Sequence, residues 1–311
     1  MSRADDNGAP ETPQQMWRRI RRLEITARRL VAEQFAGSYH SVFKGAGLQF
    51  EQIREYAPGD DPRLIDHNAT ARLGKPFVKL FVEERQLQVM LLVDMSASLR
   101  FGTVGRLKRQ LAAEFAAAIS FAALANNDKV GLALCAETVE RVLPPHRGRR
   151  HILTLLHELL NFEPSTPGTR LEVGLEKVGR QMRRRGVIFV VSDFLGGLNE
   201  ATVRQMRWIG RRHDLIAVSV LDPAESHPER LPATGLWRFE EPETGRQRVV
   251  DLAWPPARRA LIARTHRWRD ELAESLRRAE VERIALSTEG SLVPALLGFF
   301  NRRTRHMRQG V

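Results

Sequence analysis

The side chains of this sequence best suited to chemistry are carboxylates and hydroxyls that follow apolar segments. The run 94–98 (DMSAS) comes directly after the apolar residues 89–93, the run 167–169 (PGT) precedes a predicted helix, and Ser192-Asp193 follows the apolar residues 187–191. Because no His or Cys accompanies them, these oxygens suit a hard divalent cation, Mg²⁺ first and Mn²⁺ or Ca²⁺ next, rather than zinc. The sequence predicts a metal site made by Asp94, Ser96, Ser98, Thr169 and Asp193.

Each of these turns also has a structural interpretation. An Asp-x-Ser-x-Ser turn is a common helix N-cap, and a Gly-Thr pair before a helix is an ordinary cap. Asp193 can cap the next helix or belong to a phosphate-type site. The three turns together favour the metal site, because ligands of a doubly wound sheet bind beyond the carboxyl ends of its strands.

The elements that must position these residues can be predicted from the pattern of apolar residues. Strands that are apolar on both faces are predicted at 89–93, 129–136, 187–191, 215–221 and 281–287. Amphipathic helices are predicted between them at 104–125, 149–160, 171–185, 202–212 and 257–279. Alternation of such strands with helices indicates an α/β fold, a doubly wound and mainly parallel sheet with helices on both faces.

The rest of the chain divides by composition. Residues 1–15 are predicted to be a disordered tail, and 16–87 an amphipathic helix followed by a turn-rich segment with little to bury. Residues 88–290 are predicted to form the α/β domain, with a hairpin insertion near 223–256. Residues 291–311 are predicted to form a helix and a basic tail.

This sequence resembles two known families in different segments. The five oxygen-bearing residues resemble the metal-ion-dependent adhesion site (MIDAS) of von Willebrand factor A (VWA) domains. The turn-rich segment resembles the bacterial domain family of unknown function 58 (DUF58) in the runs 45–50 (GAGLQF), 54–66 (REYAPGDDPRLID), 70–72 (TAR) and 83–85 (EER). One position departs from that pattern, because His67 stands where the family usually has an aromatic residue. His67 is interpreted as a half-buried substitute for the ring, with a metal-binding or pH-sensitive role as the alternative.

The resemblance implies a function. In VWA domains the two serines and the threonine approach the ion, so Ser96, Ser98 and Thr169 are implied as direct ligands, with Asp94 and Asp193 nearby. A carboxylate from a partner protein completes the coordination. DUF58 proteins are associated with MoxR-type AAA+ ATPases, so the resemblance implies a chaperone-like adaptor that binds such an ATPase and an unknown client protein, and no enzyme.

Composition leaves two other functions open. The chain has 49 Lys and Arg against 37 Asp and Glu, a net charge of +12, so nucleic acid or an anionic membrane surface is an alternative partner. The arginines are spread over nearly every predicted helix and no nucleic-acid motif is present, which makes this alternative the weaker one. A metal-dependent hydrolase using Asp94 and Asp193, with Asp60 and Asp61, needs a denser acidic cluster than the strand ends offer. Asp60 and Asp61 are interpreted as turn residues.

The sequence has no second cysteine and no long apolar stretch, and these two features indicate the cellular compartment. With Cys135 as the one cysteine, no internal disulfide can form, and its apolar surroundings predict a buried structural thiol. No stretch reaches the roughly 20 uncharged residues that a membrane span requires. We expect a cytoplasmic protein with no membrane span.

Overall fold

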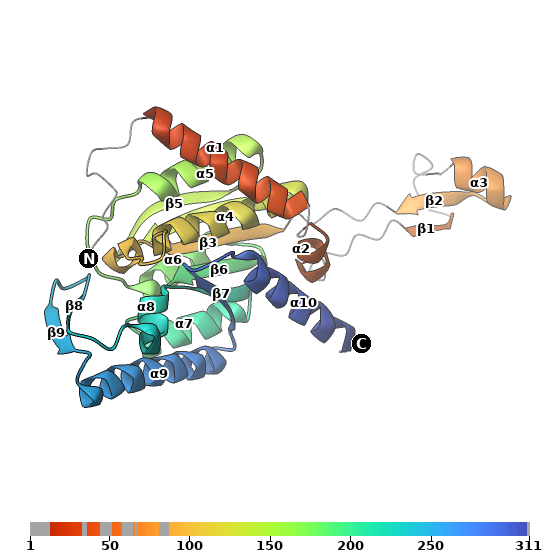
Figure 1. The fold of residues 1–311 in the computed structure, drawn as a ribbon. Coiled ribbons are helices and arrows are strands. Elements are labelled where there is room, and N and C mark those ends of the chain that lie inside the picture. The colour runs from red at the N-terminus through yellow and green to blue at the C-terminus, as the bar shows by residue number, and fades with distance from the viewer. Residues whose placement is uncertain are drawn as a thin grey trace.

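A six-stranded sheet forms the centre of the protein in the computed structural model, which describes residues 13–32, 36–43, 52–57, 65, 67–80 and 87–309. The strand order is β10-β7-β6-β3-β4-β5 (Figure 1). The strands are β3 (Gln88–Asp94), β4 (Lys129–Cys135), β5 (Val139–His146), β6 (Val187–Ser192), β7 (Asp214–Leu221) and β10 (Glu282–Ser287). All neighbours pair in parallel except β4 with β5. The predicted doubly wound, mainly parallel α/β fold is therefore confirmed.

The strand β5 is absent from the prediction. It lies at the edge of the sheet, pairs antiparallel with β4 and carries Pro144 and Pro145. Its residues are half-buried or exposed and none is fully buried, so it lacks the continuous apolar run that marks the other strands. Proline is tolerated there because an edge strand has one side without ladder hydrogen bonds.

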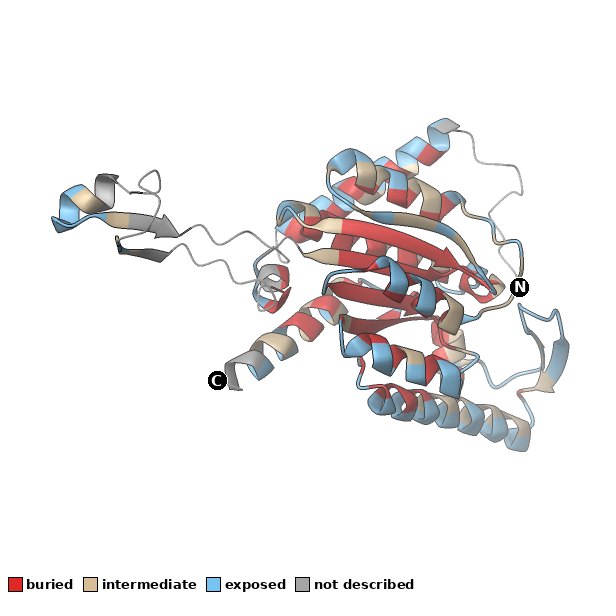
Figure 2. Cartoon of the chain, turned by 180° about the vertical axis from the view of Figure 1, so that it is seen from behind, coloured by how far each residue is buried: buried red, intermediate tan, exposed pale blue. Residues whose placement is uncertain are grey.

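Helices cover both faces of the sheet, and strand alternation separates the two apolar clusters. Val89, Leu91 and Val93 of β3 face one cluster, whereas Met90 and Leu92 face the other. The first face is covered by α1 (Pro13–Leu30), α2 (Ala36–Phe43), α4 (Lys108–Ala125), α5 (Arg149–Asn161) and α10 (Val293–Gln309). The second is covered by α6 (Leu171–Gln181), α7 (Glu200–Gly210) and α9 (Pro255–Arg278). Figure 2 shows the buried strands between these layers.

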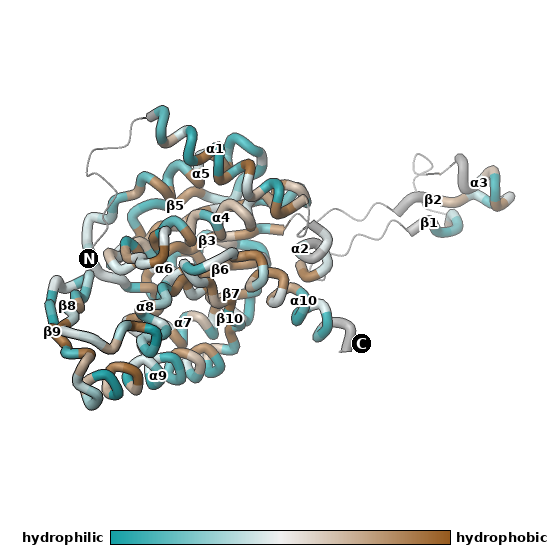
Figure 3. Tube along the Cα trace, in the orientation of Figure 1, coloured by the Kyte–Doolittle hydropathy of each residue, from teal (hydrophilic) through white to brown (hydrophobic). Residues whose placement is uncertain are grey.

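The helix α4 is buried nearly all round. Its sequence KRQLAAEFAAAISFAALA has no polar face, because the sheet covers one side and α1 the other (Figure 1). By contrast, hydrophilic and hydrophobic residues follow one another along α9, as the colours of Figure 3 show, and its buried residues are Leu272, Ser275 and Leu276. Among the described residues, no helix is long and apolar enough to cross a membrane.

The N-terminal part contributes to the core and also extends beyond it. Tyr39 and Phe43 of α2 pack edge-on against each other and against Phe300 of α10. The strands β1 (Gln52–Glu55) and β2 (Phe77–Leu80) form a small antiparallel sheet, which lies with α3 (His67–Leu73) away from the main sheet in Figure 1. The helix α1 begins at Pro13, inside the segment predicted as a disordered tail.

Three predictions for this part lie outside the described residues. They concern residues 1–12, the Asp60-Asp61 turn and the side chain of His67, whose backbone begins α3.

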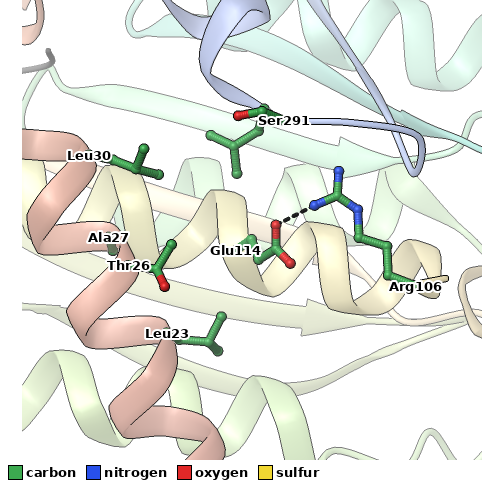
Figure 4. Close-up of a pocket in the computed structure, with 8 residues that line it drawn as sticks. Leu23, Thr26, Ala27, Leu30, Arg106, Glu114 and Ser291 are labelled. Carbon is green, nitrogen blue, oxygen red and sulfur yellow. Dashed lines mark hydrogen bonds and ion pairs between the residues drawn. The ribbon is translucent and has the colours of Figure 1, made fainter.

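Within the predicted insertion, β8 (Leu236–Glu240) and β9 (Gln247–Asp251) pair as an antiparallel hairpin. The hairpin lies beside the carboxyl ends of the strands in Figure 1. A separate hollow of about 170 Å³ lies between α1 and α4. It is lined by Leu23, Thr26, Ala27, Leu30, Arg106, Glu114, Ser291 and Leu292, with an ion pair between Arg106 and Glu114 at one end (Figure 4).

Candidate cation site

The predicted site residues come together at the carboxyl ends of β3 and β6, the two central strands. Asp94 is the last residue of β3, and Asp193 follows β6 directly. The chain leaves β3 toward α4 on one face of the sheet and leaves β6 toward α7 on the other. This reversal makes a switch point, where a doubly wound sheet binds its ligands.

Asp94 is the centre of the site, and its side chain is only 1% exposed. Its Oδ1 accepts hydrogen bonds from the backbone N–H of Ser96 at 2.9 Å and from Thr169 Oγ1 at 3.0 Å. Its Oδ2 accepts from Ser192 Oγ at 2.7 Å. The carboxylate therefore joins the β3 turn, the loop before α6 and the end of β6.

The turn after β3 presents the two serines. Ser96 Oγ and Ser98 Oγ lie 3.0 Å apart, and both side chains are buried. The backbone N–H of Ala97 donates to the carbonyl of Pro167 at 3.1 Å, which holds the loop bearing Thr169 against this turn. The turn bearing Ser96 and Ser98 and the loop bearing Thr169 therefore lie side by side at the end of β3.

Asp193 is held by a lysine that the sequence analysis did not identify. Lys108 Nζ lies 2.7 Å from Asp193 Oδ2 and 2.9 Å from each carboxylate oxygen of Glu225. The lysine side chain is 0% exposed, and Glu225 belongs to the short helix α8 (Pro223–Ser226) after β7. One buried ammonium therefore serves two carboxylates from different strand ends.

Burial and like charges raise the pKa of Asp94 and of Glu225. Burial, followed by the charge of Asp193, raises the pKa of Asp94 to about 6. Burial also raises the pKa of Glu225 to about 7, against the opposing effect of Lys108. Burial lowers the pKa of Lys108, but Asp193 and Glu225 more than offset this and raise it. Lys108 stays protonated and is the one described cation in contact with Asp193.

A third strand-end acid, Asp222 after β7, has a structural role. Its carboxylate accepts from the N–H and Oγ1 of Thr103, from Thr288 Oγ1 and from the N–H of Ala224. These bonds lower its pKa, although burial acts in the opposite direction. Asp222 is fully engaged in tying three loops together, and it offers no free oxygen to a ligand.

The donor set fits a hard cation. Adjacent ligands of an octahedral Mg²⁺, each about 2.1 Å from the ion, lie about 3 Å apart. The Ser96–Ser98 and Thr169–Asp94 oxygen pairs are both 3.0 Å apart. No group of three His, Cys, Asp or Glu side chains suited to a metal occurs among the described residues, so the site depends on hydroxyls as well as carboxylates.

The described part of this site has no accessible thiol and no hydrogen-bonded histidine. Cys135 pairs with Asp94 across β3 and β4, but it is fully buried, and burial raises the pKa of its thiol well above the usual value. No described histidine forms a hydrogen bond with the five predicted residues. The described side chains of the site are hydroxyls, carboxylates and one ammonium, and the hydroxyl and carboxylate oxygens are of the type that suits a hard cation.

Sequence comparisons place these elements among known proteins. Residues 52–271 match the family described as "Protein of unknown function DUF58". An uncharacterized protein of Mycobacterium tuberculosis is 32% identical over 291 residues, covering 92% of this chain and 89% of that protein. An uncharacterized protein of Mycobacterium avium is 29% identical over 167 residues, covering 52% of this chain and 94% of that protein.

Solved structures with a similar fold include two of interest. An aerotolerance-related membrane protein from Bacteroides fragilis aligns with a TM-score of 0.46 at 16% identity, covering 71% of this chain and 99% of that one. A von Willebrand factor type A protein from Catenulispora acidiphila aligns with a TM-score of 0.38 at 12% identity, covering 73% of this chain and 43% of that one.

Proposed function

This chain belongs to the DUF58 family, and from that premise we propose that it is a non-enzymatic protein-interaction module. A divalent cation, Mg²⁺ first, would bind at Asp94, Ser96, Ser98, Thr169 and Asp193 and would capture a carboxylate of a partner protein. One observation carries the proposal: five oxygen-bearing residues from three separate segments lie together at the switch point, with 3.0 Å between the Ser96 and Ser98 hydroxyls and 3.0 Å between the Thr169 hydroxyl and the Asp94 carboxylate.

Each of these residues would have a separate role in binding the cation. Ser96 and Ser98 offer neutral oxygens from one turn, and Thr169 offers a third from the loop before α6. Asp94 orients that set, because it accepts bonds from the Ser96 N–H and from Thr169 Oγ1. Asp193 adds negative charge, and Lys108 fixes its position. A bound cation would supply Lewis acidity for an incoming carboxylate.

The partner we propose is a MoxR-type AAA+ ATPase or a client of such a machine. This part of the proposal rests on the family resemblance of the sequence. A carboxylate-bearing partner fits the site chemically, because carboxylate oxygens are preferred ligands of Mg²⁺ and the three hydroxyls of the site carry no charge.

Calorimetric titration tests the metal first. Mg²⁺ and Mn²⁺ are added to the chelator-treated full chain at moderate salt, with wild type beside Asp94→Ala, Ser98→Ala and the exposed control Glu176→Ala. We expect wild type and the control to bind and the two site variants to lose binding. Loss of binding in the control too, or equal binding by all four proteins, would refute the site.

Partner binding is tested with the double variant Asp94→Ala/Ser96→Ala. The variant should lose the partner ATPase while its circular dichroism spectrum remains that of wild type. Unchanged binding to the ATPase would exclude the site as the contact.

A further inference from the structure

The tip of the β8–β9 hairpin lies over the candidate cation site. Glu243 stands in the turn between the two strands, and its Oε1 lies 3.5 Å from Thr169 Oγ1. The same hydroxyl lies 3.0 Å from Asp94 Oδ1. Thr169 therefore sits between two carboxylates, one from β3 and one from a hairpin far along the chain.

The Thr169 hydroxyl can donate a hydrogen bond to only one of these two carboxylates at a time. A threonine hydroxyl has a single proton, so it donates fully to one carboxylate and presents lone pairs to the other. No described Arg or Lys forms an ion pair with Glu243 or with Asp94, and Lys108 already serves Asp193 and Glu225. A cation between the carboxylates would turn this repulsive contact into a favourable one.

The hairpin tip is built to hold Glu243 in place. The backbone N–H groups of Thr244 and Gly245 both donate to the carbonyl of Glu241, and Thr244 Oγ1 donates to Glu241 Oε2 at 2.6 Å. Gly245 has φ +68°, a conformation that glycine adopts at no steric cost. These bonds close the turn without using the Glu243 side chain, which stays available to the site.

Much of the hairpin is exposed to solvent. Leu236 and Val249 are 74% and 60% exposed, and all of the residues from 241 to 249, Glu243 included, are exposed. An exposed hairpin that places an acid against like charges points to a positive ligand between them.

We infer that Glu243 is a built-in carboxylate ligand of the proposed cation and occupies the position that a partner's carboxylate must take. This inference rests on the proposed function. The hairpin would then close the site in the free protein, and a partner with a better-placed Asp or Glu would displace the tip. Binding of a partner would be coupled to release of residues 241–246.

The test measures Mn²⁺ affinity of the chelator-treated full chain by calorimetry. Glu243→Gln keeps the shape of the side chain and removes its charge, and Glu240→Gln is the matched control, an exposed hairpin acid whose Oε2 accepts from Gln247 Nε2. We expect Glu240→Gln to bind like wild type and Glu243→Gln to bind about tenfold or more weakly. Acetate should restore part of the affinity of Glu243→Gln and leave wild type unchanged, with sodium chloride of equal ionic strength as the blank.

A second measurement reports on the hairpin itself. Mn²⁺ should slow hydrogen exchange of the amides from 241 to 250 in wild type and in Glu240→Gln, and should leave them unchanged in Glu243→Gln.

Two results would overturn the inference, and they can be told apart. Equal Mn²⁺ affinity and equal exchange in all three proteins would exclude Glu243 while leaving the cation site intact. Absence of Mn²⁺ binding in wild type would refute the proposed function and the ligand role together.

Discussion

Replacement of Lys108 by methionine tests the electrostatic arrangement beneath the site. Methionine keeps an unbranched side chain of similar length and removes the ammonium. Lys108 is fully buried, and its Nζ contacts Asp193 at 2.7 Å and Glu225 at 2.9 Å. The substitution would leave two carboxylates without their cation at the end of the sheet.

The expected cost follows from that geometry. Removing one partner of a buried ion pair costs about 3–5 kcal/mol, because the other charge remains buried. We expect the lower end, about 3 kcal/mol, since the pKa of Glu225 is already about 7 and a proton can neutralise this acid. The free energy of unfolding should fall by this amount in chelator-treated protein at pH 7.

Urea unfolding followed by circular dichroism measures the change. Lys177→Met is the matched control, because Lys177 is exposed on α6 and its loss should alter stability by less than about 0.5 kcal/mol. The double variant Lys108→Met/Glu225→Gln should regain part of the lost stability. A Lys108→Met protein as stable as Lys177→Met would refute the claim that this ammonium balances the strand-end acids.

Three further predictions concern other parts of the fold. The hydrogen bond from Arg149 lowers the pKa of Glu24. The ionised acid therefore stabilises the protein above its unfolded pKa of about 4.5, and this stabilisation is lost as the pH falls. The thermal unfolding temperatures of wild type and Glu24→Gln should differ at pH 7 and converge near pH 3. Cys135 is buried, and the pKa of its thiol is raised. Iodoacetamide at pH 8 should therefore leave the native protein unmodified and label Cys135 only in denaturant. Rapid labelling of the native protein would contradict this prediction. Gly174→Val should cost about 1–3 kcal/mol in urea unfolding, because a Cβ at this position lies 2.9 Å from Leu92 Cδ1; an unchanged midpoint would contradict the tight packing.

Local patterns in the sequence were sufficient for most of the α/β core. The strands β3, β4, β6 and β7 are buried on both faces, so each appears as a continuous apolar run whatever its neighbours are. The pattern does not identify β5, because an edge strand needs only partial burial and accepts prolines.

The hydroxyl and carboxylate residues of the site were also visible in the sequence. They lie within a few residues of strand ends, and such turns are local features. Asp94, Ser96 and Ser98 share one turn, and a doubly wound sheet brings Thr169 and Asp193 to the same edge.

The partners of these residues were decided by tertiary structure alone. Lys108 lies 85 residues from Asp193 and 117 from Glu225, and Glu243 lies 74 residues from Thr169. A lysine in the first turn of a helix opposes the helix dipole, so nothing local predicts one at the start of α4. Sequence periodicity reports which faces are buried and which turns are short. Pairing of charges between distant segments depends on how helices and loops pack on the sheet, and only the folded chain determines it.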